Sequence, residues 1–241
     1  MIDLHCHFLP GIDDGPQTMA QALDLARAAV ADGITHSVLT SHVHPERYAN
    51  QRSSLELAVA QFSAELAQGG IALHVRLGAE ARLCPELMEL VAEGQVPFLG
   101  QVGGFHILLL EFPHQMIPLG SLPFVKSLLR QKIRPLIAHP ERNKTVMENA
   151  DKVREFTDVG CWLQLTAGSL VGRFGPQAQQ TAYALIDAGH PCLAATDAHH
   201  LPSRPPWLNE ARAALAQRYG EPVAHSMVRG KPAQIIGLVG S

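Results

Sequence analysis

Short apolar runs alternate with longer stretches of helical periodicity along the whole chain, and this alternation is what most restricts the fold. The run IDLHCH, for example, is followed by TMAQALDLARAAVADG, a segment predicted to form a helix that begins after Thr18 and ends at Gly33. The residues predicted to share one face of this helix are Leu23, Ala26, Ala29 and Val30. Seven such strand–helix repeats predict a parallel sheet, and the nearly continuous apolar strands indicate that both faces of that sheet are covered.

The predicted strands lie in IDLHCH, ITHSVLTSH, IALHVRLGAE, FHILLLEFP, RPLIAHPERN, CWLQLTAGS and PCLAATDAHH. The longest helices are expected in SSLELAVAQFSAELAQGG, VMENADKVREFTDVG and QAQQTAYALIDAGH, and a helical tail follows the last strand. Seven repeats in 241 residues are compatible with a closed barrel or with an open, doubly wound sheet. No linker or shift in composition divides the chain, so residues 1–241 are expected to form a single domain.

Charge and cysteine usage restrict the class of protein further. The formal net charge of -3 gives no broad basic field, which disfavours nucleic acid as the main partner. No signal peptide and no apolar stretch of about 18 residues is apparent, so neither secretion nor a membrane span is expected. The cysteines Cys6, Cys84, Cys161 and Cys192 are widely spaced and are interpreted as reduced, mostly buried thiols of a cytoplasmic protein.

Metal-binding residue types stand at the C-terminal end of six of the seven predicted strands. Active sites of parallel barrels and sheets assemble at that end. The candidates are His5, His7, Asp14, His42, Glu80, Glu111, His139, Asp197 and His199. Two of them have a neighbour of the same type, since Asp13 competes with Asp14 and His44 with His42.

This set is larger than a single catalytic zinc ion needs, because such an ion usually has three protein ligands. Imidazoles and carboxylates without cysteine suit a cluster of Mn, Fe or Zn ions. Such a cluster makes hydroxide from water and binds the oxygens of a phosphate ester, while a nearby carboxylate or imidazole relays the proton of the leaving group.

A cysteine-dependent tyrosine phosphatase is excluded by spacing. That chemistry needs an arginine six positions after the nucleophilic thiolate, so that the phosphate-binding loop wraps the anion. The residues at that distance from the four cysteines are Ile12, Leu90, Ala167 and Ala198.

The motifs HCH, DDG, TSH, GAE, LEFP, AHPERN and TDAHH together resemble those of the PHP (polymerase and histidinol phosphatase) metallohydrolases. More narrowly, HFLPGIDDGPQT, IAHPERN, LTAGSLVGRFG and TDAHHLPSRPP resemble the bacterial tyrosine phosphatases of capsule and exopolysaccharide operons, the CpsB/YwqE type. This resemblance implies a distorted (β/α)7 barrel with a site for three divalent ions, usually Mn²⁺, although Fe and Zn accept the same ligands.

The resemblance also implies a role for each candidate residue. The first ion would be held by His5, His7, Glu80 and Asp197. Glu80 would bridge to a second ion held with Glu111 and His139, and a third would be held by Asp14, His42 and His199. Arg142 and Arg204 would face the substrate phosphate, which a guanidinium can bind through two parallel hydrogen bonds. The catalytic residues expected on this basis are Arg142, Arg204, His42 and His199.

The activity implied is hydrolysis of phosphotyrosine on the tail of a bacterial tyrosine kinase that controls polysaccharide export. The alternatives are a histidinol-phosphate or small-nucleotide phosphatase, a 3′-5′ exonuclease, and a non-catalytic metal-binding or kinase-docking module. The net charge of -3 disfavours the exonuclease, which needs a basic groove. Two loops, SHVHPERYANQRSS and EFPHQMIPLG, are expected beside the site, where Tyr48 and Phe112 either contact an aromatic substrate or pack at its rim.

Overall fold

The strands of the protein form two hydrogen-bonded sheets. The computed structural model describes residues 1–238. The first sheet has the parallel order β1-β2-β4, with β1 at Ile2–Cys6, β2 at His36–Leu39 and β4 at His74–Leu77. The second has the parallel order β10-β9-β8-β7-β5-β3. Its strands are β3 (His42–Val43), β5 (Glu80–Arg82), β7 (Phe105–Glu111), β8 (Ile133–Ala138), β9 (Trp162–Thr166) and β10 (Cys192–Ala195).

Two of the predicted strands are each broken into two, which corrects the sequence-based boundaries. ITHSVLTSH forms β2 and then β3, and IALHVRLGAE forms β4 and then β5. At each break the chain passes from the first sheet to the second. Gly78 lies at the second break, where a Cβ atom would stand 2.6 Å from Cγ1 of Val38, so the close approach requires glycine.

Hydrogen bonds between β1 and the end of β10 connect the two sheets on the other side. The backbone N–H of Asp197 donates to the carbonyl of His5 at 2.8 Å, and that of His7 donates to the carbonyl of Ala198 at 2.8 Å. Seven strand positions therefore follow one another in a ring, which is the expected distorted (β/α)7 barrel rather than the open sheet. A short strand that the sequence did not predict, β6 (Gly100–Val102), pairs antiparallel with β7.

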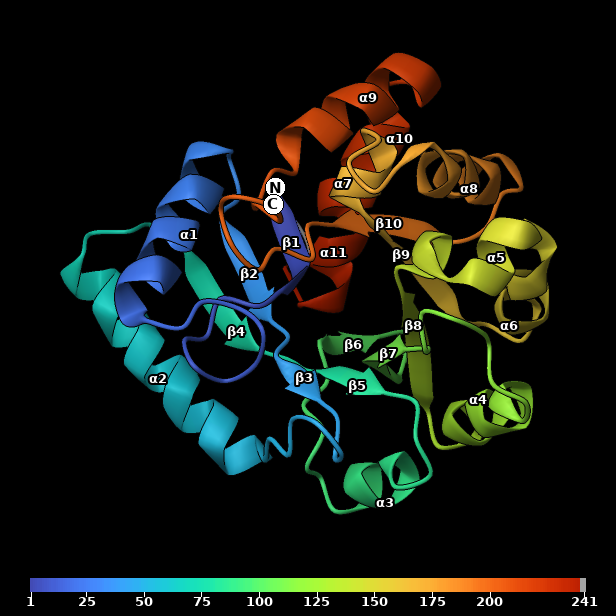
Figure 1. Ribbon diagram of the computed structural model, residues 1–241, viewed down its shortest axis with the longest axis horizontal. Coiled ribbons are helices and arrows are strands. Elements are labelled where there is room, and N and C mark those ends of the chain that lie inside the picture. Colours follow the sequence, from blue (N-terminus) through green and yellow to red (C-terminus); the bar gives the residue numbers. More distant parts are fainter. Residues whose placement is uncertain (239–241) are drawn as a thin grey trace.

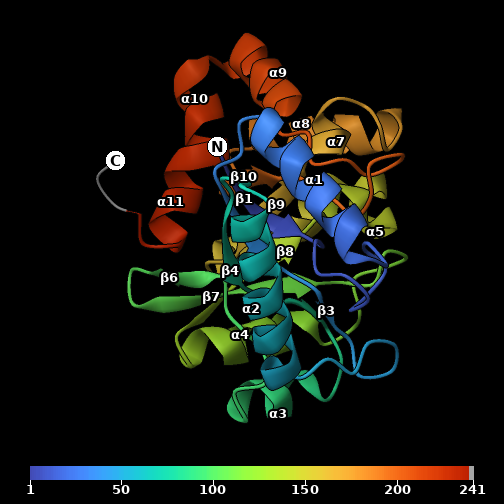
Figure 2. The same ribbon diagram turned by 90° about the vertical axis from the view of Figure 1, so that its left-hand side faces the viewer.

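Helices surround the strands (Figures 1 and 2). Helix α1 (Met19–Ala31) and helix α2 (Arg52–Gln68) lie beside the first sheet, whereas α4 (Ser121–Arg130) and α8 (Pro176–Asp187) lie beside the second. The shorter helical elements are α3 (Leu87–Ala92), η1 (Pro140–Arg142), α5 (Lys144–Glu148), η2 (Ala150–Val153), α6 (Arg154–Asp158) and α7 (Ala167–Leu170). The C-terminal elements are α9 (Asn209–Tyr219), α10 (Glu221–His225), η3 (Ser226–Gly230) and α11 (Lys231–Ile235), which confirm the predicted helical tail.

Helix α1 begins where the sequence predicts, because Thr18 and Gln21 form a reciprocal capping box. Its buried face differs from the prediction. Ala26 and Ala29 are buried as expected, but the face is completed by Ala22 and Leu25, while the predicted Leu23 and Val30 are half-buried. The buried face is thus rotated about the helix axis relative to the predicted one.

Two other predicted elements are also divided. VMENADKVREFTDVG forms α5, η2 and α6 instead of one helix, because Asn149 takes an extended conformation and its side chain caps the next turn by accepting from Asp151 N at 3.0 Å. The strand predicted in CWLQLTAGS ends at Thr166, and its last residues form the first turn of α7.

The end of α11 closes one part of the core. A cluster of buried apolar residues draws on β1, β2, β7, β8 and β10 and also includes Ile235 and Ile236, at the end of α11. Because strands of both sheets contribute, this cluster lies between the two sheets, inside the barrel. Within residues 1–238 no helix combines the length and the apolar character needed to span a bilayer.

Candidate metal centre

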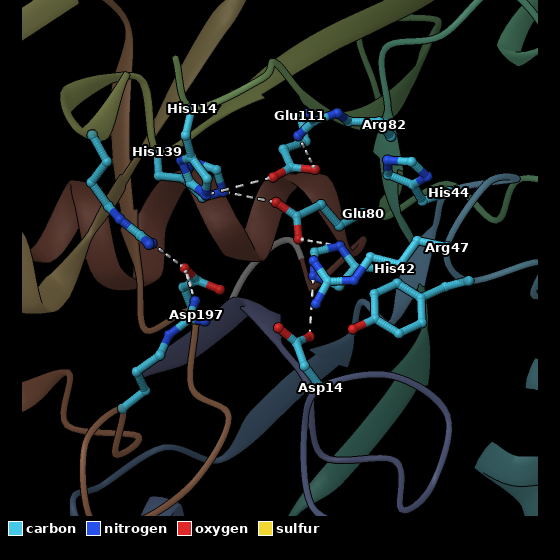
Figure 3. Close-up of a pocket in the computed structure, with 13 residues that line it drawn as sticks. Asp14, His42, His44, Arg47, Glu80, Arg82, Glu111, His114, His139 and Asp197 are labelled. Carbon is cyan, nitrogen blue, oxygen red and sulfur yellow. Dashed lines mark hydrogen bonds and ion pairs between the residues drawn. The ribbon is translucent and has the colours of Figure 1, made fainter. Parts of the chain in front are cut away.

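The carboxyl ends of the strands surround a polar cavity of about 200 Å³ (Figure 3). Residues from β3, β5, β7 and from the loops after β1, β3, β7, β8 and β10 line it. The lining residues are Asp14, His42, His44, Arg47, Tyr48, Glu80, Arg82, Glu111, His114, His139, Arg142, Asp197 and Arg204. The remaining predicted ligands, His5, His7 and His199, are buried against this cluster. All nine candidates are therefore brought to one place.

The first group of potential ligands consists of His5, His7, Glu80 and Asp197. Nε2 of His5 lies 3.2 Å from a carboxylate oxygen of Glu80 and 3.2 Å from one of Asp197. All four side chains are almost completely buried. This is the set that the family resemblance implies for the first ion.

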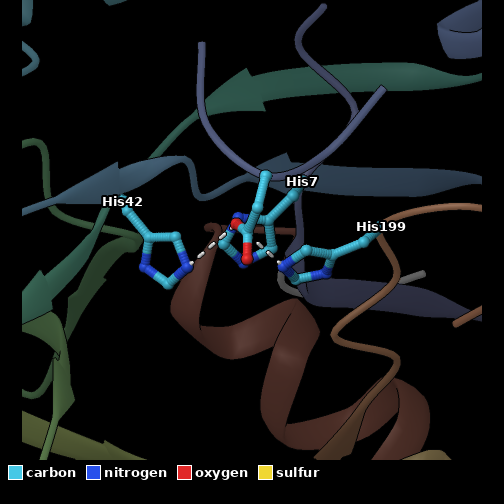
Figure 4. A group of neighbouring side chains, drawn as sticks. His7, His42 and His199 are labelled. Atoms are coloured by element: carbon cyan, nitrogen blue, oxygen red, sulfur yellow. Dashed lines mark ion pairs between the residues drawn. The ribbon is translucent and has the colours of Figure 1, made fainter. Parts of the chain in front are cut away.

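The second group consists of His7, Asp14, His42 and His199 (Figure 4). Oδ1 of Asp14 lies 3.4 Å from Nε2 of His42 and 3.4 Å from Nε2 of His199. The predicted set for the third ion is thus assembled around Asp14, with His7 close enough to join it.

The third group differs in part from the prediction. It contains His42, Glu80 and Glu111, whereas the family resemblance implies His139 together with Glu80 and Glu111. His139 is nevertheless close, since its Nε2 lies 2.9 Å from Oε1 of Glu80. Glu80 therefore touches both His42 and His139, as expected of a carboxylate that bridges two ions.

The two imidazoles of β1 and its turn are oriented by buried hydrogen-bond partners. Nδ1 of His5 donates to Oε1 of Gln164 at 2.8 Å, and Nδ1 of His7 donates to Oδ2 of Asp13 at 2.9 Å. In each ring Nε2 is left to face the ligand group, which is the usual arrangement around a metal ion. Asp13 is buried below His7 and Asp14 lines the cavity, so the two neighbouring aspartates have different positions.

The turn that carries these aspartates packs tightly against β1. A Cβ atom on Gly15 would stand 2.3 Å from the carbonyl oxygen of His7, so no other residue fits there without displacing the backbone.

Two site residues have strained backbones. His139 has a φ of 33° and Asp197 a φ of 53°, in the left-handed region that residues other than glycine rarely adopt. Both directly follow or nearly follow a strand, at the point where the chain turns into the site. Strain of this kind concentrates where side-chain geometry serves function.

Charges within the cluster support one another. Although burial disfavours a charged imidazole, the carboxylates of Glu80 and Asp197 raise the pKa of His5 to about 9. A metal ion bound here would displace the proton from Nε2 of His5, because a coordinating imidazole is neutral. Burial likewise disfavours ionisation of Glu80 and Asp197. Neighbouring imidazoles nevertheless hold the pKa of Glu80 well below its usual range, and the Arg204 guanidinium together with neighbouring imidazoles does the same for Asp197. The carboxylates are therefore anionic despite their burial, which is the state that binds a cation.

The pKa values of His139 and His199 are shifted in the opposite direction to that of His5. Burial lowers the pKa of each to about 4, so both rings are neutral and able to coordinate a metal near pH 7. Within the described residues, Nε2 of His199 and Oδ1 of Asp197 are buried without a hydrogen-bond partner. Unpartnered buried acceptors are costly, and a divalent cation satisfies them. The residues present therefore fit a metal cluster.

Both predicted arginines reach the cavity, and both contact Asp197. Nη1 of Arg142 donates to Oδ2 of Asp197 at 2.6 Å, and Arg204 donates to the same oxygen. The pair thus stands beside the ligand groups, at a single carboxylate.

Three further residues that line the cavity were not predicted from the sequence. Arg82 pairs with Glu111 at 3.1 Å, the ring of His114 stacks on His139 at 5.1 Å, and Arg47 lies over the ring of Tyr48. The position of Arg82 was detectable, because it lies two residues after Glu80 on the same strand and so shares its face.

The two aromatic residues expected at the rim lie in different places. Tyr48 lines the cavity and stacks on His42, with 5.4 Å between ring centroids. Phe112 is buried and packs against Phe156, so it belongs to the core. His44, the alternative to His42, lines the cavity but joins none of the ligand groups.

A parallel barrel that gathers buried imidazoles and carboxylates at its strand ends is typical of metal-dependent hydrolases. The chain belongs to the CpsB/CapC family of capsular polysaccharide synthesis, whose model matches residues 1–237.

Named relatives and a solved structure agree with this family. The chain is 33% identical to tyrosine-protein phosphatase YwqE of Bacillus subtilis over 94% of this chain and 88% of that protein. It is 31% identical to the putative tyrosine-protein phosphatase CapC of Staphylococcus aureus, over 85% of this chain and 79% of that protein. A crystal structure from work on YwqE of Bacillus subtilis and CpsB of Streptococcus pneumoniae, described as metal-dependent tyrosine phosphatases, superposes with a TM-score of 0.90 at 31% identity. The superposition covers 98% of this chain and 94% of that chain.

Proposed function

We propose that the protein is a metal-dependent tyrosine-protein phosphatase of capsular or exopolysaccharide synthesis. The observation that carries this proposal is the meeting of three ligand groups and two arginines at one cavity. The names of the matched relatives supply the substrate class, because YwqE and CpsB are called tyrosine-protein phosphatases. The natural substrate we propose is a phosphotyrosine tail of a bacterial tyrosine kinase in the cytoplasm.

The three ligand groups would each hold a metal ion. We assign one divalent ion to each ligand group and propose Mn²⁺, while Fe and Zn also suit these donors. The bound ions would supply positive charge that lowers the pKa of water and neutralises the phosphate oxygens. His42 and His199 would act by holding the third ion, together with Asp14.

The arginines would bind the phosphoryl group itself. A guanidinium matches two phosphate oxygens and keeps its charge at any working pH. Arg142 and Arg204 come from different loops but meet at Asp197, so they can hold one phosphate from two directions. Phosphoryl transfer is catalysed mainly by such positioning and charge neutralisation.

The test is hydrolysis of a phosphotyrosine peptide by metal-stripped protein, with and without added Mn²⁺. Histidinol phosphate is assayed beside it, because another phosphomonoesterase of the same fold is the competing function. We expect Mn²⁺-dependent turnover of the peptide, and a loss of about 100-fold or more in Arg142→Ala.

The control is Arg154→Ala, which removes an exposed arginine paired with Asp151 on the surface and should leave turnover unchanged. Turnover of histidinol phosphate alone would reassign the substrate, and no turnover with any metal would exclude a phosphatase.

A further inference from the structure

The segment LTAGSLVGRFG has no role in the site described so far. It begins with the last two residues of β9, the barrel strand whose end contributes none of the predicted metal ligands. After α7 it forms a compact loop in which Arg173 N donates to the carbonyl of Gly168 at 2.8 Å and Gly175 N donates to that of Gly172 at 3.1 Å. Gly172 and Gly175 both have positive φ values, which other residues rarely adopt. The backbone of this loop is therefore closely defined.

Side chains of α8 hold the loop in place. Nε2 of Gln179 and the hydroxyl of Tyr183 both donate to the carbonyl of Leu170, at 3.0 and 2.9 Å. The end of α7 is thereby tied to a long helix of the barrel.

The loop places Phe174 against Arg142. The carbon at the centre of the guanidinium lies 4.2 Å from the centroid of the Phe174 ring, well within the range of a cation–π contact. The ring also packs closely against Gly168, where a Cβ atom would stand 2.9 Å from Cε2 of Phe174. The ring occupies space that exists because residue 168 has no side chain.

Arg142 needs such support, because its polar contact fixes the position of one nitrogen but not the orientation of the guanidinium plane. Within residues 1–238 its guanidinium makes one hydrogen bond, from Nη1 to Oδ2 of Asp197. One hydrogen bond leaves the guanidinium plane free to turn about it, and Oδ2 is also shared with Arg204. Binding two phosphate oxygens side by side requires that plane to be correctly oriented.

The preceding residue ties the same two segments together. Oε1 of the buried Glu141 accepts from Thr166 N at 2.9 Å and from the hydroxyl of Ser169 at 2.7 Å. Arg142 and Phe174 are thus carried by segments that are joined both through Glu141 and through the stacked ring.

We propose that Phe174 is a positioning residue, whose ring fixes the guanidinium plane of Arg142 for binding the substrate phosphate. This inference rests on the proposed function, since it takes Arg142 as the phosphate ligand. It assigns a role to the LTAGSLVGRFG segment, which lies outside the metal ligands.

The test is a double-mutant cycle on the Mn²⁺-loaded protein. Phe174→Leu should lower kcat/KM for a phosphotyrosine peptide by about five- to tenfold and weaken the affinity for inorganic phosphate to a similar degree. Phe174→Tyr keeps an aromatic ring and should restore both values. In an Arg142→Ala background the same Phe174→Leu change should have no further effect, because the group it positions is gone.

Phe105→Leu is the matched control. Phe105 also lies under an arginine, with the Arg134 guanidinium 4.4 Å from its ring, but it stands at the start of β7, away from the strand ends that form the site. It should leave kcat/KM and phosphate affinity unchanged. Urea unfolding of each variant separates a loss of positioning from a loss of stability.

The outcomes distinguish the two proposals. If the wild-type protein binds phosphate but does not hydrolyse the peptide, the proposed function fails, and the cycle in phosphate affinity still tests Phe174. A Phe174→Leu effect that persists undiminished without Arg142 would overturn the positioning role, since the ring would then contact the substrate or only support the fold. Failure of the wild-type protein to bind phosphate would overturn it as well.

Discussion

The orientation of individual side chains at this site is determined by hydrogen-bond partners that do not line the cavity. His5 and His7 each present Nε2 to the ligand groups because Nδ1 is engaged by Gln164 or Asp13. Asp13 also accepts from the backbone N–H groups of Gly15 and His42, so both of its oxygens are surrounded by donors. An amide cannot replace it, because its NH2 group would face one of these donors.

Asp13→Asn is therefore expected to lower Mn²⁺ affinity by about 10- to 100-fold without removing a ligand. Isothermal titration of the metal-free protein measures this. Asp24→Asn, on the exposed face of α1, should bind Mn²⁺ like the wild type. Unchanged affinity in Asp13→Asn would show that the orientation of His7 does not depend on this carboxylate.

The raised pKa values of the buried cysteines predict low thiol reactivity. Burial raises the pKa of the Cys161 and Cys192 thiols to about 12, and that of Cys6 well above its usual value. These thiols should stay protonated and unalkylated by iodoacetamide at pH 8, while the partly exposed Cys84 reacts slowly. Mass spectrometry of the native protein locates the label. Phosphatase activity should survive the treatment, and its complete loss would contradict a metal-based mechanism.

At the scale of elements, the site depends on how the chain leaves each strand. The turn after β8 passes through the strained His139 into η1, and Glu141 attaches this turn to β9 and α7. Glu141 is fully buried, and its burial raises its pKa. Its carboxylate is thus the link that positions the segment carrying Arg142.

Glu141→Ala should destabilise the protein by about 2 kcal/mol, because two buried donors lose their acceptor. The free energy of unfolding from urea titration measures the loss, and Ser169→Ala should show a smaller loss by itself. The exposed Glu155 of α6 provides the matched control, since Glu155→Ala should be nearly neutral. A Glu141→Ala variant as stable as the wild type would mean that the turn is held by its other contacts.

The whole molecule brings together buried ligand atoms that a cation would satisfy, such as Oδ1 of Asp197 and Nε2 of His199. Ligands from both ends of the chain, such as His5 and Asp197, meet at the centre. We therefore expect metal to contribute to global stability and not only to activity.

Saturating Mn²⁺ at about 100 times its dissociation constant should stabilise the fold by about 2.7 kcal/mol. For a chain of this size that corresponds to a rise in Tm of about 5–10 °C. Differential scanning fluorimetry of chelator-treated protein, with Mn²⁺ added back, measures it, and Mg²⁺ serves as a comparison ion. Identical Tm values with and without Mn²⁺ would argue against a resident cluster.

We also propose that residues 1–241 fold as one domain. The two tryptophans report on separate places, because Trp162 begins β9 and Trp207 precedes α9. Urea unfolding followed by fluorescence and by circular dichroism should give one coincident transition. Two separated transitions would reveal independent units.

The sequence by itself determined the class of fold and the candidates for the site. Strand–helix alternation predicted a parallel sheet covered on both faces, and the CpsB/YwqE resemblance implied that this sheet closes into a barrel. The rule that active sites form at the carboxyl ends of strands selected the nine candidate ligands. These predictions succeed because they depend on local periodicity and on chain order. The CpsB/YwqE resemblance then supplied Arg142 and Arg204, for which local periodicity gives no signal.

Only the tertiary structure decided how these residues are grouped and supported. It broke two strands so that His42 and Glu80 could enter the second sheet, and it placed His42 beside Glu111. It also brought Phe174 to Arg142 across 32 positions of sequence. Such contacts join segments distant in sequence, and their geometry follows from the packing of the whole barrel, which no local pattern encodes.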